Sequence, residues 1–290
     1  MSKSIGIIGG DLRICMLAGL LASDWYRVYT YGLEKMKIEE GLSKHIIFCK
    51  EVGELAKEVD IIISSIPLER EEKVVYTPYS DEVVRIDKVF EAIQGKTIIA
   101  GAIEEYVYEI AKRSDVHTID ILKKEELSVL NSIPTAEGAI QVAISESDIT
   151  LHNSNCLILG FGRIGKILAH MLHGIGAKVY CEARREEDLA WIEAYGYNKI
   201  VLDNLGESLG NYDYIFNTIP YIILDEQKLS NLKEKCLIIE LASKPYGVDI
   251  KAAEKKGIKV IIASGLPGKV APLTSARYLK SIIYKTIENM

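Results

Sequence analysis

The stretch Cys156-Leu157-Ile158-Leu159-Gly160-Phe161-Gly162-Arg163-Ile164-Gly165 joins an apolar run to a G-x-G-x-x-G turn. The apolar run predicts a buried strand, and the spacing of residues 164–173 predicts a helix directly after the turn. In that context the first glycine permits a tight turn, the second lets the backbone approach a pyrophosphate, and the third lets helix and strand pack closely. The helix N-terminus adds amide donors for phosphate. We therefore predict a dinucleotide site made by Gly160, Phe161, Gly162, Arg163, Ile164 and Gly165.

Similar apolar runs alternate with segments of helical spacing along the whole chain. They occupy residues 5–8, 46–48, 61–63 and 97–99, and then 156–159, 177–180, 214–216, 237–239 and 260–262. Runs that are apolar on both faces are typical of parallel strands buried between helix layers. The sequence thus predicts an α/β fold with two doubly wound, Rossmann-like domains, a cleft between them and crossing helices.

The two series of runs also suggest domain boundaries. We expect an N-terminal substrate domain over residues 1–132 and an NADP-binding domain over 151–271. A helix over 133–150, capped by Thr135 or its neighbour, should connect them. The apolar spacing of residues 272–290 predicts a last helix that packs back on the first domain.

Composition excludes several classes of protein. The 290 residues are 48% hydrophobic and 26% charged, so the chain can bury a sizeable core. The net charge of -6 argues against nucleic acid or an anionic membrane as partner. The sequence contains no run of ~18 apolar residues, so we expect no membrane span. The five cysteines form no C-x-x-C pair, so we expect buried thiols, no metal and a cytoplasmic location.

The choice of cofactor depends on the end of the second strand of the glycine unit. NAD enzymes place an acid there for the ribose hydroxyls. Counting from Gly160, the acid of D-2-hydroxyacid dehydrogenases with a similar turn falls at Ala183, and Arg184 and Arg185 follow. Guanidinium groups suit a 2′-phosphate, so the sequence favours NADP. Glu182, one residue earlier, leaves NAD open.

Both halves end a strand with a small polar pair and Ile-Pro, at 64–67 and 217–220. Strand ends line the ligand crevice of open α/β sheets. We therefore expect Ser65 to contact substrate. The expected cofactor contacts of this kind are Asn217, Thr218 and Pro220, together with Ser243 after the run 237–239.

Two further segments bring cations to strand ends. The amides of Gly9 and Gly10, with Arg13, could hold a carboxylate, which makes Gly10, Asp11 and Arg13 substrate-binding candidates. The loop 265–272 should face the nicotinamide, with Pro267 and Gly268 as substrate contacts and Lys269 as a catalytic residue and cation for the substrate. Two cations suit a dianionic substrate. Residues 67–88 are either a lid or a surface excursion.

An acid–base pair is harder to find. None of the five histidines follows residue 173, where hydroxyacid dehydrogenases keep theirs, so that activity is disfavoured. Thr135 and Glu137 either cap a helix or serve the site, Thr135 as a substrate ligand and Glu137 as a base.

These motifs together resemble the family of the dipicolinate synthase A subunit over residues 5–276. The most specific are Pro134-Thr135-Ala136-Glu137-Gly138-Ala139 and Gly265-Leu266-Pro267-Gly268-Lys269-Val270-Ala271-Pro272. Tyr246 departs from an expected glycine, and 273–276 lacks a small glycine turn. The resemblance implies NADP-dependent oxidation of dihydrodipicolinate to dipicolinate in the mother cell of a spore-forming bacterium, beside a flavoprotein-like B subunit of dipicolinate synthase.

Two alternatives stay open beside that resemblance. One is another two-domain NADP enzyme acting on an amino, imino or hydroxy acid. The other is a non-catalytic partner protein that binds a nucleotide. A homo-oligomer is expected in each case.

Overall fold

The computed structural model describes residues 4–38, 41–71 and 73–290. Contacts between residues divide the chain into two compact units. Unit 1 holds Met1–Leu130 and Ala271–Met290, and unit 2 holds Asn131–Val270.

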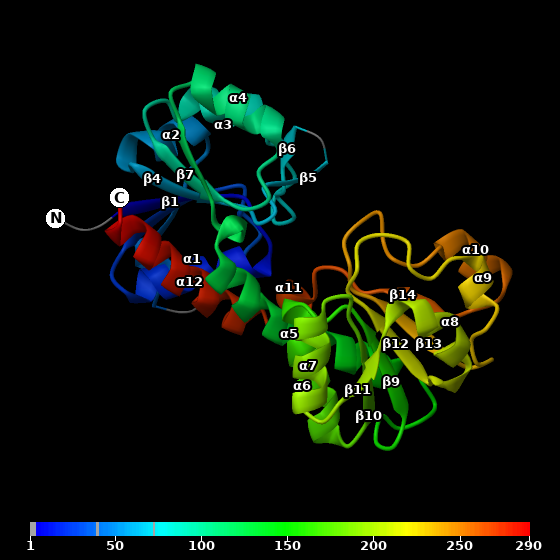
Figure 1. Cartoon of the computed structure of the whole chain (residues 1–290). Helices are drawn as coiled ribbons and strands as arrows, with labels where there is room; N and C mark the ends of the chain where they lie inside the picture. Colours follow the sequence, from blue (N-terminus) through cyan, green and yellow to red (C-terminus); the bar gives the residue numbers. More distant parts are fainter. Residues whose placement is uncertain (1–3, 39–40, 72) are drawn as a thin grey trace. The chain divides into compact units, whose positions relative to one another are not determined.

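Unit 1 is a six-stranded parallel sheet with helices on both faces (Figure 1). Its strands run in the order β3-β2-β1-β4-β7-β8, that of a doubly wound sheet with a switch point between β1 and β4. The elements up to β8 are β1 (Ser4–Ile8), α1 (Leu12–Ser23), β2 (Arg27–Tyr31), a 3-10 turn (Ser43–His45), β3 (Ile46–Phe48), α2 (Val52–Glu58), β4 (Ile61–Ser64), β5 (Glu69–Glu71), β6 (Val74–Val75), α3 (Ile86–Ala92), β7 (Thr97–Ala100), α4 (Glu105–Arg113) and β8 (His117–Asp120).

The C-terminal helix α12 (Pro272–Glu288) completes this unit. Its buried side chains, among them Leu279 and Ile283, share one apolar cluster with those of α1. Figure 1 shows the two helices side by side beneath the sheet, while α2, α3 and α4 cover the opposite face. Residues far apart in the chain thus build one core.

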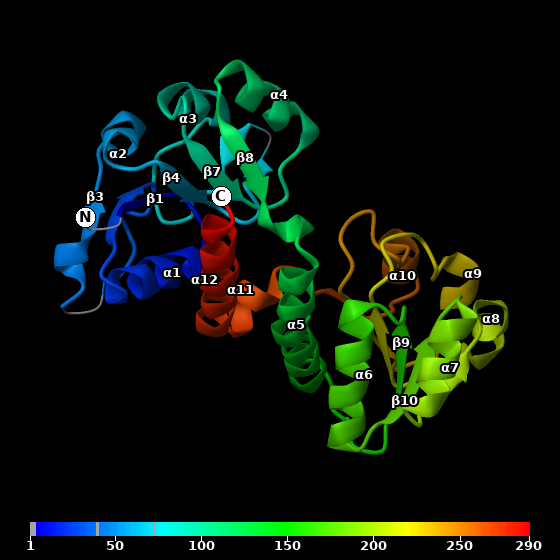
Figure 2. The same cartoon turned by 60° about the vertical axis from the view of Figure 1, so that its left-hand side comes forward.

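Unit 2 repeats the plan, with the strand order β11-β10-β9-β12-β13-β14. Helices α5 (Glu125–Ser145), α6 and α7 pack on one face, and α8, α9 and α10 on the other (Figure 2). The elements are β9 (Asn155–Leu159), α6 (Arg163–Ile175), β10 (Lys178–Glu182), α7 (Glu186–Ala194), β11 (Asn198–Ile200), 3-10 turns (Leu202–Asn204 and Leu209–Asn211), α8 (Leu205–Ser208), β12 (Tyr214–Asn217), α9 (Glu226–Leu229), β13 (Leu237–Glu240), α10 (Ile250–Lys255), β14 (Val260–Ile262) and α11 (Leu266–Val270). The prediction of two doubly wound parallel sheets is confirmed.

The connecting helix differs from the prediction. After a 3-10 turn (Ile121–Lys123), α5 runs from Glu125 to Ser145, so it starts before residue 133 and ends before 150. Pro134 lies inside this helix instead of at its start, although proline has no amide to donate to the preceding turn. The Thr135 hydroxyl donates to the Asn131 carbonyl at 2.7 Å, so Thr135 is not the predicted cap.

Two segments predicted as loops contain regular structure. Residues 67–88 hold the antiparallel pair β5–β6, and the loop after β14 folds into the short helix α11. The Gly10 amide donates to the Tyr76 carbonyl at 2.8 Å, so the 67–88 segment is fastened to the loop that follows β1.

Candidate dinucleotide-binding site

The glycine loop joins β9 to α6 in unit 2, and each glycine meets a different demand. Gly160 has a φ of +91°, a conformation that favours glycine. A Cβ on Gly165 would lie 2.1 Å from the Gly160 carbonyl oxygen, so only glycine fits there. A Cβ on Gly162 would meet nothing within 4 Å. The fold therefore requires Gly160 and Gly165, whereas the space beside Gly162 is free for a ligand.

A pocket of about 290 Å³ opens beside this loop. It collects predicted cofactor residues from three strand ends: the glycine loop after β9, the segment after β10 and the segment after β12. Its walls are Gly160, Phe161, Gly162, Glu182, Ala183, Arg184, Arg185, Asp188, Thr218, Ile219, Pro220 and Tyr221. Of the remaining loop residues, Arg163 is exposed and Ile164 half-buried on the first turn of α6.

Glu182 occupies the end of β10 with unusual partners. It is 1% exposed, and its Oε2 accepts the Gly160 amide at 3.2 Å. Its Oε1 is buried and has no hydrogen-bond partner in the described part of the chain. Burial raises the pKa of Glu182, an effect that the Gly160 amide and the charge of Arg184 oppose. A buried acceptor without a donor at the pocket wall fits a site built for a bound polar group.

The two arginines after β10 are in different situations. Arg185 is held by Asp188 and by Glu187, each at 2.7 Å. Arg184 is exposed, and its guanidinium lies 5.4 Å from the centre of the Tyr221 ring in the pocket wall. Arg184 is thus the cation better placed for an anionic group.

Asn217, predicted to touch the cofactor, is fully buried and serves the fold instead. Its Nδ2 donates to both carboxylate oxygens of Glu240, at 2.7 and 2.9 Å, and to the Ile219 carbonyl at 2.9 Å. Glu240 also accepts the amides of Ala242 and Gly247. This network fixes the loops after β12 and β13, and the sequence reasoning missed it because Glu240 stands alone in its motif.

Thr218 and Ser243, the other predicted cofactor contacts in these loops, are accessible from the surface of unit 2. The Thr218 hydroxyl donates to the Leu159 carbonyl at 2.8 Å while Thr218 lines the pocket. Ser243 is exposed, and its carbonyl accepts the Tyr246 amide. Tyr246, found where the family resemblance implied glycine, has a φ of 71°, which explains why glycine suits that position.

The prediction that the backbone amides of Gly9 and Gly10 hold an anion is wrong, because both amides already donate to carbonyl oxygens of unit 1. Gly9 donates to the Tyr31 carbonyl and Gly10 to that of Tyr76. Asp11 caps α1 and pairs with Arg13, whose Nη2 also donates to the Ile66 carbonyl.

The side chains of Arg13 and Ser65, at this end of the unit 1 sheet, also donate hydrogen bonds within the fold. Arg13 is 9% exposed, and its Nη1 alone has no hydrogen bond in the described structure. Ser65 is fully buried and donates to the Leu68 carbonyl at 2.6 Å. These groups therefore hold the loops after β1 and β4 together.

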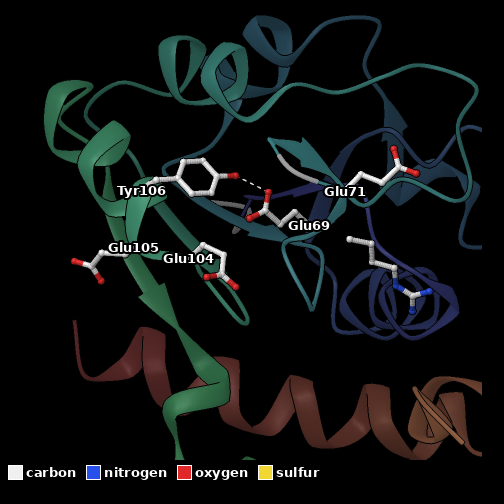
Figure 3. Close-up of a pocket in the computed structure, with 6 residues that line it drawn as sticks. Glu69, Glu71, Glu104, Glu105 and Tyr106 are labelled. Carbon is white, nitrogen blue, oxygen red and sulfur yellow. Dashed lines mark hydrogen bonds between the residues drawn. The ribbon is translucent and has the colours of Figure 1, made fainter. Parts of the chain in front are cut away.

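A shallow hollow of about 490 Å³ lies elsewhere in unit 1 (Figure 3). The Tyr106 hydroxyl donates to Glu69 within it, and Arg70 lies 4.0 Å over the Tyr76 ring. Its other walls are Glu71, Glu104 and Glu105. This much negative charge opposes the binding of a dicarboxylate.

The remaining predicted residues gather where α5 and α11 approach closely in unit 2. A Cβ on Gly138 would lie 3.0 Å from Leu266, so the glycine allows the two helices to touch. Glu137 and Lys269 are exposed beside this contact, and Thr135, Pro267 and Gly268 are half-buried. This contact brings α5, which carries Glu137, next to α11, which carries Lys269.

Other kinds of site find little support. In residues 4–38, 41–71 and 73–290, no group of three or more His, Cys, Asp or Glu side chains could hold a metal ion. No helix in those ranges is both long and apolar enough to cross a membrane.

A doubly wound sheet with a glycine loop, a buried glutamate at the end of the second strand and a pocket at the strand ends defines a nicotinamide dinucleotide-binding domain of the dehydrogenase type. Comparison with known families agrees. Residues 135–245 match the NAD-binding domain of D-isomer specific 2-hydroxyacid dehydrogenases, and residues 4–122 match the N-terminal domain of the dipicolinate synthase A subunit.

Individual relatives identify the family. The chain is 34% identical to the dipicolinate synthase A subunit of Bacillus subtilis (strain 168) over 286 residues, which cover 98% of this chain and 95% of that protein. Crystal structures of the dipicolinate synthase A subunit from Bacillus halodurans (29% identity, 98% and 97% of the two chains) and Bacillus subtilis (32%, 100% and 97%) each superpose with a TM-score of 0.88. The chain belongs to the family of the dipicolinate synthase A subunit.

More distant structures share the fold alone. A transhydrogenase from Sinorhizobium meliloti has a TM-score of 0.70 at 14% identity, with 99% of this chain and 93% of that chain covered.

Proposed function

We propose that this chain oxidises dihydrodipicolinate to dipicolinate (pyridine-2,6-dicarboxylate) with NADP as the hydride acceptor. Its membership of the family of the dipicolinate synthase A subunit carries the proposal. The pocket beside Gly162, with a cation at Arg184, supports a phosphorylated dinucleotide.

The proposed reaction removes a hydride and a proton from the dihydropyridine ring. One ring C–H bond breaks with its electron pair, a proton leaves to a base, and the ring becomes aromatic. When bound, the nicotinamide ring of NADP accepts the hydride. Aromatisation supplies the driving force, so the protein mainly orients the ring and offsets the charge of its two carboxylates.

We assign residues of this chain to two roles in that reaction: removal of the proton and binding of the substrate carboxylates. We assign Glu137 to proton removal and Lys269 to a substrate carboxylate, because both are exposed beside the α5–α11 contact. We assign Arg13 to a second substrate carboxylate through Nη1, because Nε and Nη2 already donate to Asp11 and to the Ile66 carbonyl.

The proposal extends to the setting of the enzyme. Following the family resemblance, we propose that it works with a flavoprotein-like B subunit of dipicolinate synthase in the cytoplasm of the mother cell of a sporulating bacterium. We also propose that it forms a homo-oligomer.

The test uses the purified full-length chain with dihydrodipicolinate generated in situ. We expect NADP⁺ to be reduced as the ultraviolet absorbance of dipicolinate rises, and we expect Glu137→Gln to slow turnover without weakening NADP⁺ binding. Unchanged turnover in Glu137→Gln removes Glu137 as the base. Turnover of amino or imino acids in place of dihydrodipicolinate identifies a different dehydrogenase. NADP⁺ binding without turnover, with and without the B subunit, identifies a non-catalytic partner protein.

A further inference from the structure

Unit 1 contains an apolar pocket of about 470 Å³ that the proposed reaction does not use. One wall is a single face of α1, because residues three and four apart on a helix lie side by side. The residues of this face are Leu12, Cys15, Met16, Gly19, Leu20 and Ser23. The segment between β2 and β3 lines the pocket with residues 35–38 and 42, and Tyr79 and Leu273 contribute from other segments.

The pocket lies where the doubly wound plan ordinarily places a crossover helix. In unit 2 the connection from β10 to β11 contains α7, whose Leu189 and Ile192 share an apolar cluster with α6. In unit 1 the described residues of the connection from β2 to β3 form turns and one 3-10 turn, but no α-helix. One face of α1 is therefore incompletely covered, and two leucines that line the pocket stay exposed, Leu12 at 37% and Leu273 at 41%.

Gly19 enlarges this pocket although the packing does not require a glycine there. Glycine inside a helix is less favourable than alanine. A Cβ on Gly19 would meet only Leu42 Cδ1, at 3.8 Å, which is an ordinary contact. Met16 on α1 and Met36 on the segment between β2 and β3 also line the pocket. Methionine side chains are flexible and polarisable, so they adapt to the shape of an apolar ligand.

The charge at the pocket has one sign. Lys35 and Lys37 are the charged residues among its described walls, and both are exposed. Lys35 already pairs with Asp81, whereas Lys37 forms no ion pair with any described residue. An ammonium group on a flexible stem can follow a carboxylate at the mouth of a pocket. The lining therefore suits a molecule with an apolar body and one anionic group.

We propose that this pocket binds a small amphipathic anion, namely a free carboxylic acid with an aliphatic chain. The chain lies against Met16 and Met36, and the carboxylate lies at Lys37. The volume falls within the range of about 300–1,000 Å³ that is usual for small-molecule sites. The pocket shares no residue with the dinucleotide pocket of unit 2, so this site is separate from that of the proposed function.

The experiment measures the Kd of octanoate by titration calorimetry for the full-length wild-type chain and for Gly19→Leu. We expect Gly19→Leu to weaken octanoate about tenfold or more, because the added side chain occupies the space of the ligand. Gly174→Leu is the matched control, since Gly174 lies on α6 in unit 2 and a Cβ there would meet nothing within 4 Å. The Kd of NADP⁺ should be unchanged in Gly19→Leu, which shows that the variant is folded.

A charge variant tests the anionic end of the ligand. We expect Lys37→Gln to weaken octanoate about two- to fivefold and to leave 1-octanol, which has no charge, unaffected. Equal changes for the two ligands overturn the anionic part of the proposal.

A third measurement needs no variant. In a chain labelled with ¹³C at the methionine methyl groups, octanoate should shift the NMR signals of Met16 and Met36 and leave that of Met171, in unit 2, in place. A wild-type chain that does not bind octanoate, or a Gly19→Leu chain that binds it as tightly as the wild type, overturns the site. If octanoate fails to bind and Gly19→Leu dissociates an oligomer, a second copy of the chain occupies the pocket, which also overturns the proposal.

Discussion

Gly162 separates the demands of the fold from those of a cofactor. A Cβ there would meet nothing within 4 Å, and its φ of -85° suits any residue. We therefore expect Gly162→Ala to fold with a melting temperature close to that of the wild type. The added methyl group occupies the space through which a pyrophosphate approaches the loop. NADP⁺ affinity, measured by calorimetry, should fall about tenfold or more.

The control for that variant is Gly165→Ala, three residues further on. Its Cβ would lie 2.1 Å from the Gly160 carbonyl oxygen, so this variant should lose stability first and binding as a consequence. If Gly162→Ala binds NADP⁺ as tightly as the wild type, the pocket beside the loop is not the pyrophosphate site.

Arg184 and Arg185 allow a direct test of the phosphate assignment. Arg184 is exposed at the pocket wall, whereas Arg185 is already held by Glu187 and Asp188. A charged hydrogen bond to phosphate contributes roughly 1.5–3 kcal/mol, so Arg184→Ala should weaken NADPH binding about ten- to hundredfold and leave NADH little changed. Arg185→Ala should weaken NADPH less. Equal losses for NADPH and NADH in Arg184→Ala contradict a 2′-phosphate contact.

Local sequence spacing predicts which neighbouring residues lie together at a strand end. It does not reveal a hydrogen-bond acceptor that lies on a remote segment of the chain. The glycine loop and the residues after β10 meet in one pocket, as their spacing predicts. Gly10 and Ser65 carry equally plausible signals, yet the Tyr76 and Leu68 carbonyls take their donors. Those carbonyls belong to the 67–88 segment, whose fold no local pattern revealed.

The same contrast holds for whole elements. The predicted apolar runs all became strands, whereas β2, β8 and β11 were not among them. β8 and β11 are edge strands with exposed or half-buried side chains, so their sequences lack an apolar pattern. β2 lies inside the sheet but carries Thr30, a fully buried polar residue that interrupts its apolar run. Helix α5 was mispredicted because Pro134 is ordinarily a first-turn residue.

Helix α12 contributes four buried side chains to the core of unit 1: Ala276, Leu279, Ile282 and Ile283. Leu279 is 1% exposed in the cluster shared with α1. Leu279→Ala removes buried methyl groups and leaves a cavity, which costs about 2–5 kcal/mol. We expect urea unfolding of unit 1, followed by Trp25 fluorescence in a Trp191→Phe background, to shift to lower urea. Trp25 belongs to unit 1 and Trp191 to unit 2.

Leu273→Ala is the matched control on the same helix, because Leu273 is 41% exposed and should change stability by about 0.5 kcal/mol or less. NADP⁺ affinity should be the same in both variants, since the pocket lies in unit 2. A Leu279→Ala chain as stable as the wild type contradicts the role of α12 in this core.

At the scale of the whole molecule, all five cysteines are buried as free thiols, which confirms the sequence prediction of buried thiols. Burial raises the pKa of Cys15, Cys156 and Cys236 from 9.0 to about 12 in each case. The folded chain therefore binds these protons more tightly than the unfolded chain does. This contribution to stability is fully present below pH 9.0 and is lost as the pH rises through the folded value of about 12.

We accordingly expect the free energy of unfolding in urea to fall steeply above about pH 9, where an unfolded cysteine begins to ionise. Cys236→Ala should reduce that slope, because it removes one of the buried thiols. A thiol reagent at neutral pH should leave the native chain almost unmodified and label all five cysteines after denaturation. Rapid labelling of the native chain, or a stability that stays level across this pH range, contradicts the buried, protonated state of these thiols.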